Sequence, residues 1–219
     1  MLTDILAWIT NLGLLFLISS VILWGFYYRR IPRAIQLLGY YLASNLLIQV
    51  VAGYLWEKSL NNLPLLHLNT LLEFIFFSLF FREVYIDMRF FKKYFNIILE
   101  GMTLFLVYNA IFWEPLSDLN SNASSLTHGF LIGYVILYFF DAFGRVDFSK
   151  KEEQAISFIC FAVLLCYAGS LFIFMFSQFI TKESLEGYRL FWIVNGCLTS
   201  IFQMIVLIAI SKIIFQRNK

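Results

Sequence analysis

Seven long apolar runs divide this sequence, and they constrain its fold more than any other feature. The runs lie near residues 4–27, 34–56, 65–82, 93–113, 127–144, 155–180 and 189–214. A bilayer core about 30 Å thick is crossed by roughly 20 apolar residues in a helix. A membrane β-strand is about half as long and alternates polar with apolar residues, so these runs indicate helices. We therefore predict an all-α, polytopic transmembrane bundle of seven helices that forms one domain over residues 1–219.

The composition excludes an ordinary soluble domain. Hydrophobic residues make up 61% of the 219 residues and charged residues only 14%, whereas soluble domains carry about 25% charged residues. A water-soluble fold of this length has no interior large enough for that excess, so the lipid bilayer is the predicted partner of most of the surface. Because the longest connection is about a dozen residues, we expect no attached catalytic domain and no enzymatic activity of the chain's own.

The basic residues lie in alternate connections. Thirteen of the 16 Lys and Arg residues fall in or beside YYRRIPR, REVYIDMRFFKK, GRVDFSKKEEQ and the tail QRNK. The other connections hold only Lys58, Lys182 and Arg189. By the positive-inside rule this bias places the N-terminus outside and the C-terminus in the cytoplasm. The basic loops suit anionic lipid rather than nucleic acid.

Polar residues recur at helical spacing in five of the runs. Residues three or four apart share a face of a helix, and polar side chains in a membrane span usually face other helices or a wet cavity. We therefore expect five inward polar stripes, although hydrogen bonds between helices explain such stripes as well as a ligand or ion path does. The stripes are Asn45, Gln49 and Gly53; Asn69 and Glu73; Asn96, Glu100 and Thr103; Tyr134, Tyr138 and Asp141; and Asn195, Thr199 and Gln203.

Glu73 is the acid predicted nearest the bilayer midplane. It lies eight or nine residues from either end of its run, and because an α-helix rises about 1.5 Å per residue, this places it near the midplane. An ionised carboxylate at that depth costs several kcal/mol unless it is paired or hydrated. Because no Lys or Arg lies at comparable depth, we expect Asn, Gln, Tyr or water as its partners. Either it forms a proton, cation or ligand site, or it is a protonated acid bonded to a neighbouring amide. Glu100 is predicted about a third of the way in from the cytoplasmic side.

Several classes of site are disfavoured by the sequence. His67 and His128 are both predicted at the outer ends of their spans, but nothing resembles HExxH and a three-His zinc site needs one more His. We predict no metal and no cofactor. A retinal Schiff base is excluded, because the last run has its only lysine, Lys212, at the cytoplasmic end. All three prolines fall in loops, which argues against broken transporter helices, while Gly-containing stretches such as VAGYLW leave transport open.

Two segments carry a family resemblance. NNLPLLHLNTLLEFIFFSLFFREVY, together with FWIVNGCLTS in the last run, resembles uncharacterised bacterial seven-helix membrane proteins. These are similar to the membrane-embedded sensor modules of histidine kinases. The resemblance implies an inner-membrane input module with its ligand site in the outer half of the bundle, near His67, Asn69, Glu73, Trp192 and Asn195. With no output domain after Lys219, a separate signalling or membrane-protein partner is expected to carry the signal.

The sequence thus leaves three functions open. The leading hypothesis is a sensor-like or ligand-binding membrane module. The alternatives are a small-solute or proton-coupled transporter that uses Glu73, and a structural subunit of a membrane complex. The predicted ligand or proton site draws on Glu73, Asn69, His67, Asn45, Gln49, Glu100, Asn195, Thr199 and Gln203.

Overall fold

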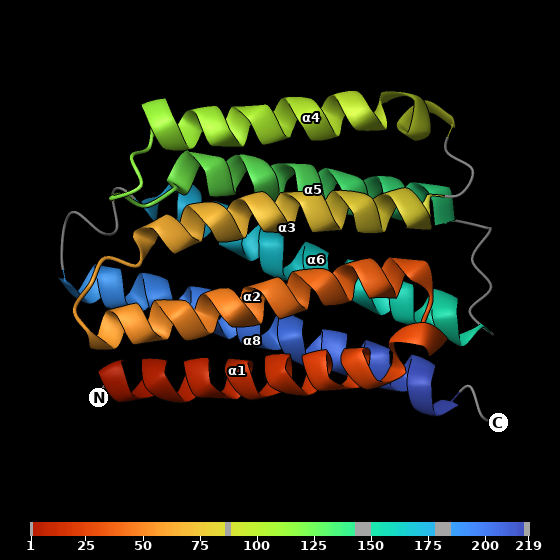
Figure 1. Ribbon diagram of the computed structural model, residues 1–219, viewed down its shortest axis with the longest axis horizontal. Helices are drawn as coiled ribbons and strands as arrows, with labels where there is room; N and C mark the ends of the chain where they lie inside the picture. Colours follow the sequence, from red (N-terminus) through yellow and green to blue (C-terminus); the bar gives the residue numbers. More distant parts are fainter. Residues whose placement is uncertain (1, 86–88, 143–149, 178–184, 217–219) are drawn as a thin grey trace.

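A computed structural model describes residues 2–85, 89–142, 150–177 and 185–216 (Figure 1). Within these residues the chain forms seven α-helices and a short 3-10 helix, η1 (Tyr28–Arg30). All seven helices are long and apolar enough to cross a membrane, so the predicted seven-helix architecture is confirmed. The helices are α1 (Leu2–Tyr27), α2 (Arg33–Glu57), α3 (Leu63–Val84), α4 (Arg89–Phe112), α5 (Ser121–Ala142), α6 (Lys151–Met175) and α8 (Leu185–Gln216).

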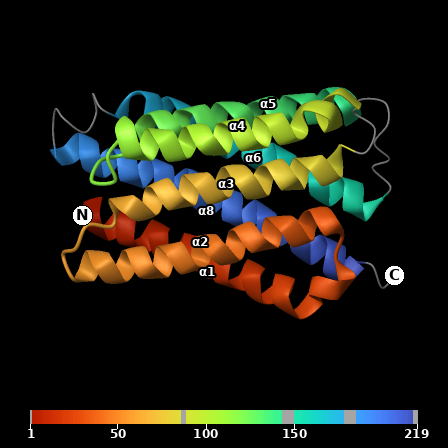
Figure 2. The same cartoon turned by 45° about the horizontal axis from the view of Figure 1, so that its top comes forward.

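The helices lie side by side along one axis, and the two termini lie at opposite ends of the bundle (Figures 1 and 2). We call the end that holds the start of α1 and the α2–α3 and α4–α5 connections the N-terminal end. The end that holds η1 and the close of α8 is the C-terminal end. Successive helices reverse direction, so α1, α3, α5 and α8 begin at the N-terminal end and α2, α4 and α6 begin at the C-terminal end (Figure 1).

Six helices form a closed ring, and the seventh lies outside it. Along the ring α1 packs on α2, α2 on α3, α3 on α5, α5 on α6, α6 on α8, and α8 again on α1. Helix α4 packs against α3 from outside (Figures 1 and 2). The side chains of α3 therefore face the middle of the ring on one side and α4 on the other.

Short breaks in the sequence set the helix ends. Pro32 precedes α2 with an extended ψ of 155°, since a proline cannot continue the η1 turn with a backbone N–H donor. Ser59, after α2, has a left-handed φ of 54°, which reverses the chain before α3. Pro64 occupies the first turn of α3, where its missing N–H has no helical partner to lose.

Glycines allow close contacts between helices on the α1 side of the ring. A Cβ atom at Gly39 in α2 would lie 2.0 Å from the Trp24 ring of α1, and that indole donates a hydrogen bond to the Gln36 carbonyl (3.2 Å). A Cβ atom at Gly13 would lie 2.6 Å from Ser200 Oγ of α8. Small residues serve membrane bundles in this way because close packing replaces the hydrophobic effect between helices.

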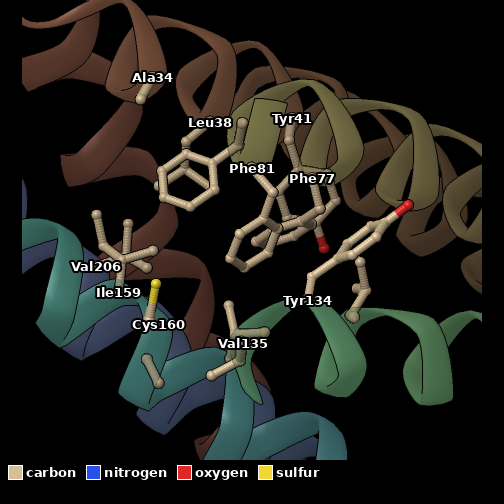
Figure 3. Packing of buried hydrophobic residues seen from close by; sticks show 14 of the residues in the cluster. Ala34, Leu38, Tyr41, Phe77, Phe81, Tyr134, Val135, Ile159, Cys160 and Val206 are labelled. Carbon is tan, nitrogen blue, oxygen red and sulfur yellow. The ribbon is translucent and has the colours of Figure 1, made fainter. Parts of the chain in front are cut away.

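The half of the ring towards the C-terminal end is filled by aromatic side chains. Phe77 and Phe81 of α3 lie between Tyr41 and Leu38 of α2 and Tyr134 of α5 (Figure 3). The ring centroids of Phe77 and Tyr41 are 5.0 Å apart, and those of Phe81 and Tyr134 are 5.4 Å apart. These rings, which are fully or almost fully buried, close the centre of the bundle on that side.

Candidate functional site

Glu73 lies buried at the middle of α3. Only 5% of the residue is exposed, and it lies ten residues from Leu63 and eleven from Val84. Its Oε1 atom is 3.5 Å from His128 Nε2 of α5, and His128 is also 5% exposed. Its Oε2 atom accepts a hydrogen bond of 3.5 Å from Asn69 Nδ2, one turn earlier in α3. Facing helices thus bring a carboxylate and an imidazole together inside the bundle.

Two tyrosines complete the surroundings of this pair. The side chains of Tyr41 in α2 and Tyr167 in α6 lie near the Glu73 carboxyl group. The rings of His128 and Tyr167 have centroids 4.8 Å apart, and Phe174 of α6 packs edge-on against His128 at 5.5 Å. The site therefore draws on α2, α3, α5 and α6, and we call Asn69, Glu73, His128, Tyr41 and Tyr167 the polar centre.

The prediction of the partners of Glu73 was incomplete, because it did not include His128. Asn69 and the tyrosines belong to the expected residue types, but His128 was predicted to lie at the outer end of its span. Helix α5 begins at Ser121, six residues before the predicted start, because its first turn is built from small polar residues that do not register as apolar. His128 therefore lies about two turns inside the helix, where it reaches Glu73.

The polar centre has unused hydrogen-bonding capacity. Asn69 Oδ1, Glu73 Oε1, Thr127 Oγ1 and His128 Nδ1 are buried and form no hydrogen bond among the described residues. For Glu73 Oε1 the nearby His128 Nε2 at 3.5 Å is within ion-pair distance but forms no hydrogen bond. A buried polar group without a partner costs about 1–3 kcal/mol. Asn69 and Glu73 lie one turn apart in α3, and Thr127 and His128 are consecutive residues of α5. Buried polar atoms without a partner are the places where a bound water molecule or a small polar ligand is expected.

A ladder of polar contacts lies between the polar centre and the N-terminal end. One turn from Glu73 towards the N-terminal end, Thr70 of α3 shares a hydrogen bond of 3.2 Å with Ser124 of α5. Asn120, just before α5, donates to Thr70 Oγ1 (2.7 Å) and to the Leu66 carbonyl (3.1 Å). At the end of the helix His67 Nε2 donates to the Asp118 carbonyl (3.2 Å). We call Thr70, Asn120 and Ser124 the polar ladder.

The opposite direction along α3 is apolar. Phe74, Phe77 and Phe81 are 0% exposed, and Figure 3 shows Phe77 and Phe81 pointing into the middle of the bundle. Ser78 interrupts this aromatic face with a long hydrogen bond of 3.4 Å to the Tyr134 hydroxyl. The polar centre is therefore flanked by hydrogen-bonding groups towards one end of the bundle and by aromatic rings towards the other.

The predicted stripe on α2 joins the polar centre. Gln49 Nε2 donates to Asn45 Oδ1 (2.8 Å), and Asn45 Nδ2 donates to the Tyr41 hydroxyl (3.1 Å). Asn45 and Gln49 thus extend the site along α2 towards the N-terminal end. Gly53, the last residue of that predicted stripe, is exposed, so the polar interior stops one turn earlier than expected.

The predicted stripe on α8 lies between helices but is not joined to Glu73 by any hydrogen bond among the described residues. Asn195 Oδ1 accepts a hydrogen bond of 3.3 Å from Ser170 of α6, which is the interhelical contact that explains it. Thr199 is half-buried. Gln203 is 1% exposed, and neither polar atom of its amide has a partner among the described residues.

The prediction of an inward stripe on the fourth span was wrong. Asn96 and Glu100 are both exposed on α4, and only Thr103, the third residue of the stripe, is half-buried. Their spacing places them on one face of the helix, but it does not decide which face points inward. The inward face of α4 is instead formed by Phe95, Met102 and Asn109, which are buried. Glu100 is therefore not part of the polar centre.

Sequence reasoning missed Glu114, which follows α4 and is 6% exposed. Its carboxylate accepts hydrogen bonds from Asn109 Nδ2 (2.7 Å) and from the backbone N–H groups of Asn122 (2.7 Å) and Ala123 (3.1 Å). A carboxylate at the first amides of a helix satisfies orphan donors and favours the dipole. Glu114 thus caps α5, and only a correct start for α5 would have revealed it.

Comparison of the chain with protein-family models, curated proteins and solved structures finds no match in any of the three. The fold and hydropathy define the class: the chain is a multi-pass membrane protein with a seven-helix bundle. Among the described residues no group of three or more His, Cys, Asp and Glu side chains could hold a metal ion.

Proposed function

We propose that this protein is a sensor-like membrane module that binds a small polar ligand at the polar centre. It would lie in a bacterial inner membrane with its N-terminal end outside. The positive-inside rule assigns to the cytoplasm the four basic segments YYRRIPR, REVYIDMRFFKK, GRVDFSKKEEQ and QRNK, which with Lys212 hold 13 of the 16 Lys and Arg residues. The polar ladder would then face the exterior. A partner protein would receive the signal at the C-terminal end.

The observation that carries this proposal is the set of unpartnered buried atoms around Glu73 and His128. Ionisable residues inside a membrane span are expensive and are generally functional. A site built only for packing would be expected to satisfy its own polar atoms, because each unsatisfied one lowers stability. Leaving four of them on facing helices is a cost that ligand binding would offset.

The donor and acceptor pattern defines the class of ligand. Glu73 Oε1 and Asn69 Oδ1 are acceptors and call for N–H or O–H donors. When His128 donates from Nε2 towards Glu73, its Nδ1 atom is an acceptor in the neutral ring and a donor in the charged ring. A small amine, ammonium or hydroxyl compound with several donors fits this set, and the acidic centre favours a positive charge.

The same contacts offer a route for a signal. Tyr41 and Tyr167 link Glu73 to α2 and α6, while His128 links it to α5. A ligand that takes the hydrogen bonds of Glu73 would change its interactions with these three helices together. Because the C-terminal half of the ring is packed with rigid rings such as Phe77 and Phe81, a shift of α3 would be passed to the cytoplasmic end rather than absorbed.

A proton-coupled transporter is the second candidate, and Glu73 at mid-depth is the observation in its favour. Alternating access requires the site to open towards each side in turn. The buried aromatic side chains towards the C-terminal end close one of those routes, which favours the sensor. A purely structural subunit would use the polar ladder for packing, and it offers no role for the unpartnered atoms.

Thermal unfolding of the purified protein in detergent tests the proposal with ammonium, methylamine, glycine and glycerol as probes. We expect at least one amine to raise the midpoint, since a ligand at 100 times its Kd stabilises the native state by about 2.7 kcal/mol. Glu73→Gln should abolish that rise. Glu57→Gln, the same change at an exposed position at the end of α2, is the matched control and should retain it.

Proteoliposomes loaded with a pH-sensitive dye separate the two leading functions. A sensor module should bind the amine without moving protons or solute across the membrane. Proton or amine flux that is present in the wild type and lost in Glu73→Gln would overturn the sensor in favour of the transporter. An undiminished thermal response in Glu73→Gln would remove the polar centre as the binding site.

A further inference from the structure

The outward face of α4 carries a carboxylate at a depth where contact with lipid is costly. Glu100 lies eleven residues from Arg89 and twelve from Phe112. Counted from Lys93, where the apolar span begins, it is still about two helical turns or 10 Å inside. It is exposed on the protein surface, on the side of α4 opposite Met102 and Asn109. A charged side chain costs about 2.5–3.5 kcal/mol or more at the centre of a membrane-spanning helix, and an acid facing acyl chains two turns inside the span carries part of that cost.

The residues around Glu100 form a mixed surface rather than a purely apolar one. Asn96 is exposed one turn before Glu100, and Gly101 is exposed beside it. A Cβ atom at Gly101 would meet nothing within 4 Å among the described residues. Ile97 and Leu104, exposed by 67% and 70%, lie on the same side of α4. We call Asn96, Ile97, Glu100, Gly101 and Leu104 the α4 face.

We propose that the α4 face is a dimer interface whose occupant is the α4 face of a second copy of this chain. Two copies related by a two-fold axis along the membrane normal place their α4 helices parallel and at equal depth. Such an interface is self-complementary, because each contact occurs twice. The Asn96 amide of each copy then donates to the Glu100 carboxyl group of the other, and both acids leave the lipid.

Three properties of the α4 face fit this occupant. It holds a hydrogen-bond donor, the Asn96 amide, one turn from an acceptor, the Glu100 carboxyl group. In a two-fold dimer the donor of each copy can bond to the acceptor of the other. Gly101 lets two helix backbones approach closely, as small residues do at membrane helix interfaces. Helix α4 also lies outside the six-helix ring (Figure 2), so a second copy can reach it without disturbing the polar centre. The dimer does not depend on the ligand site proposed above.

Two variants separate the polar contact from the fold. Glu100→Leu removes the carboxyl group and replaces it with a side chain that lipid tolerates, so the monomer should stay folded. Glu100→Gln keeps hydrogen-bonding groups at the same place. In lipid vesicles, with single-molecule photobleaching as the readout, we expect Glu100→Leu to weaken dimerisation by tenfold or more. Two lost interhelical bonds of about 0.6–1 kcal/mol each give that change. Glu100→Gln should dimerise within a few-fold of the wild type.

Disulfide cross-linking locates the contact. In a background with Cys160, Cys166 and Cys197 replaced by Ser, Leu104→Cys should form a covalent dimer on oxidation in native membranes. Leu15→Cys, exposed by 58% on α1, is the matched control and should stay monomeric. A monomeric wild type, equal dimerisation of the wild type and Glu100→Leu, or a Leu104→Cys cross-link to a different protein would each overturn the proposal.

Discussion

Glu73 and His128 are each costly to bury alone and are tolerable because they face one another at 3.5 Å. Removing one partner of a buried pair leaves the other without compensation, whereas removing both can be nearly neutral. The same two residues are therefore expected to be coupled in stability as well as in ligand binding. That coupling distinguishes a pair that acts as a unit from two polar residues that happen to be neighbours.

A double-mutant cycle measures this coupling. Glu73→Gln and His128→Leu should each lower the free energy of unfolding by about 1–3 kcal/mol. The double variant should lose less than the sum, by at least 0.5 kcal/mol, as for residues in direct contact. Unfolding in mixed micelles supplies the measurement. Strict additivity would mean that the two side chains do not interact in solution.

Glu114 is a second buried acid, but its partners make it a structural one. Glu114→Ala removes the acceptor for two backbone donors at the start of α5 and for the Asn109 amide of α4, and it should cost about 1–2 kcal/mol of stability. Asp118→Ala, at an exposed acid four residues on, supplies the comparison and should change stability by less than 0.5 kcal/mol. Both are read from the midpoint of thermal unfolding, and equal losses would contradict the capping role.

At the scale of the elements, the sequence predicts the helices well and their faces less well. The span over 34–56 corresponds to Arg33–Glu57, because charged or turn-forming residues bracket a run of the right length. The predicted start of α5 was six residues too late, because SNASSL is helical without being apolar. His128 was therefore predicted at the end of its span, whereas it lies about two turns inside the helix. The Asn96–Glu100 spacing was recognised, but its direction depends on α4 lying outside the ring, which is a tertiary property.

Close packing of α1 on α2 provides a test at this scale. Gly39→Ala should destabilise the bundle by about 1–3 kcal/mol, since the new Cβ would overlap the Trp24 ring and overpacking costs that much. Gly53→Ala lies in the same helix, where a Cβ meets nothing within 4 Å among the described residues. That change should be neutral or should stabilise by up to about 1 kcal/mol, as Ala is the better helix former. Similar losses for both variants would show that α1 is not packed on Gly39.

At the scale of the whole molecule, the bundle is asymmetric along its axis. The polar ladder and the α2 amides occupy the half towards the N-terminal end, and Phe74, Phe77 and Phe81 close the other half. The site residues could be picked from the sequence at Glu73 and Asn69, since polarity at mid-depth is rare. The polar ladder could not, because Thr70, Ser124 and Asn120 resemble ordinary helix and loop residues until α3 and α5 are placed together.

The orientation of this asymmetric bundle decides which side of the membrane reaches the polar centre. In a background with Cys197 replaced by Ser, Asn61→Cys at the N-terminal end and Arg30→Cys at the C-terminal end both place a thiol on an exposed residue. If the positive-inside rule holds, a membrane-impermeant thiol reagent should label Asn61→Cys in intact cells or spheroplasts. It should label Arg30→Cys only after the membrane is permeabilised. The reverse pattern would place the polar ladder in the cytoplasm. The ligand would then have to be an intracellular one, because the polar ladder lies between that end of the bundle and Glu73.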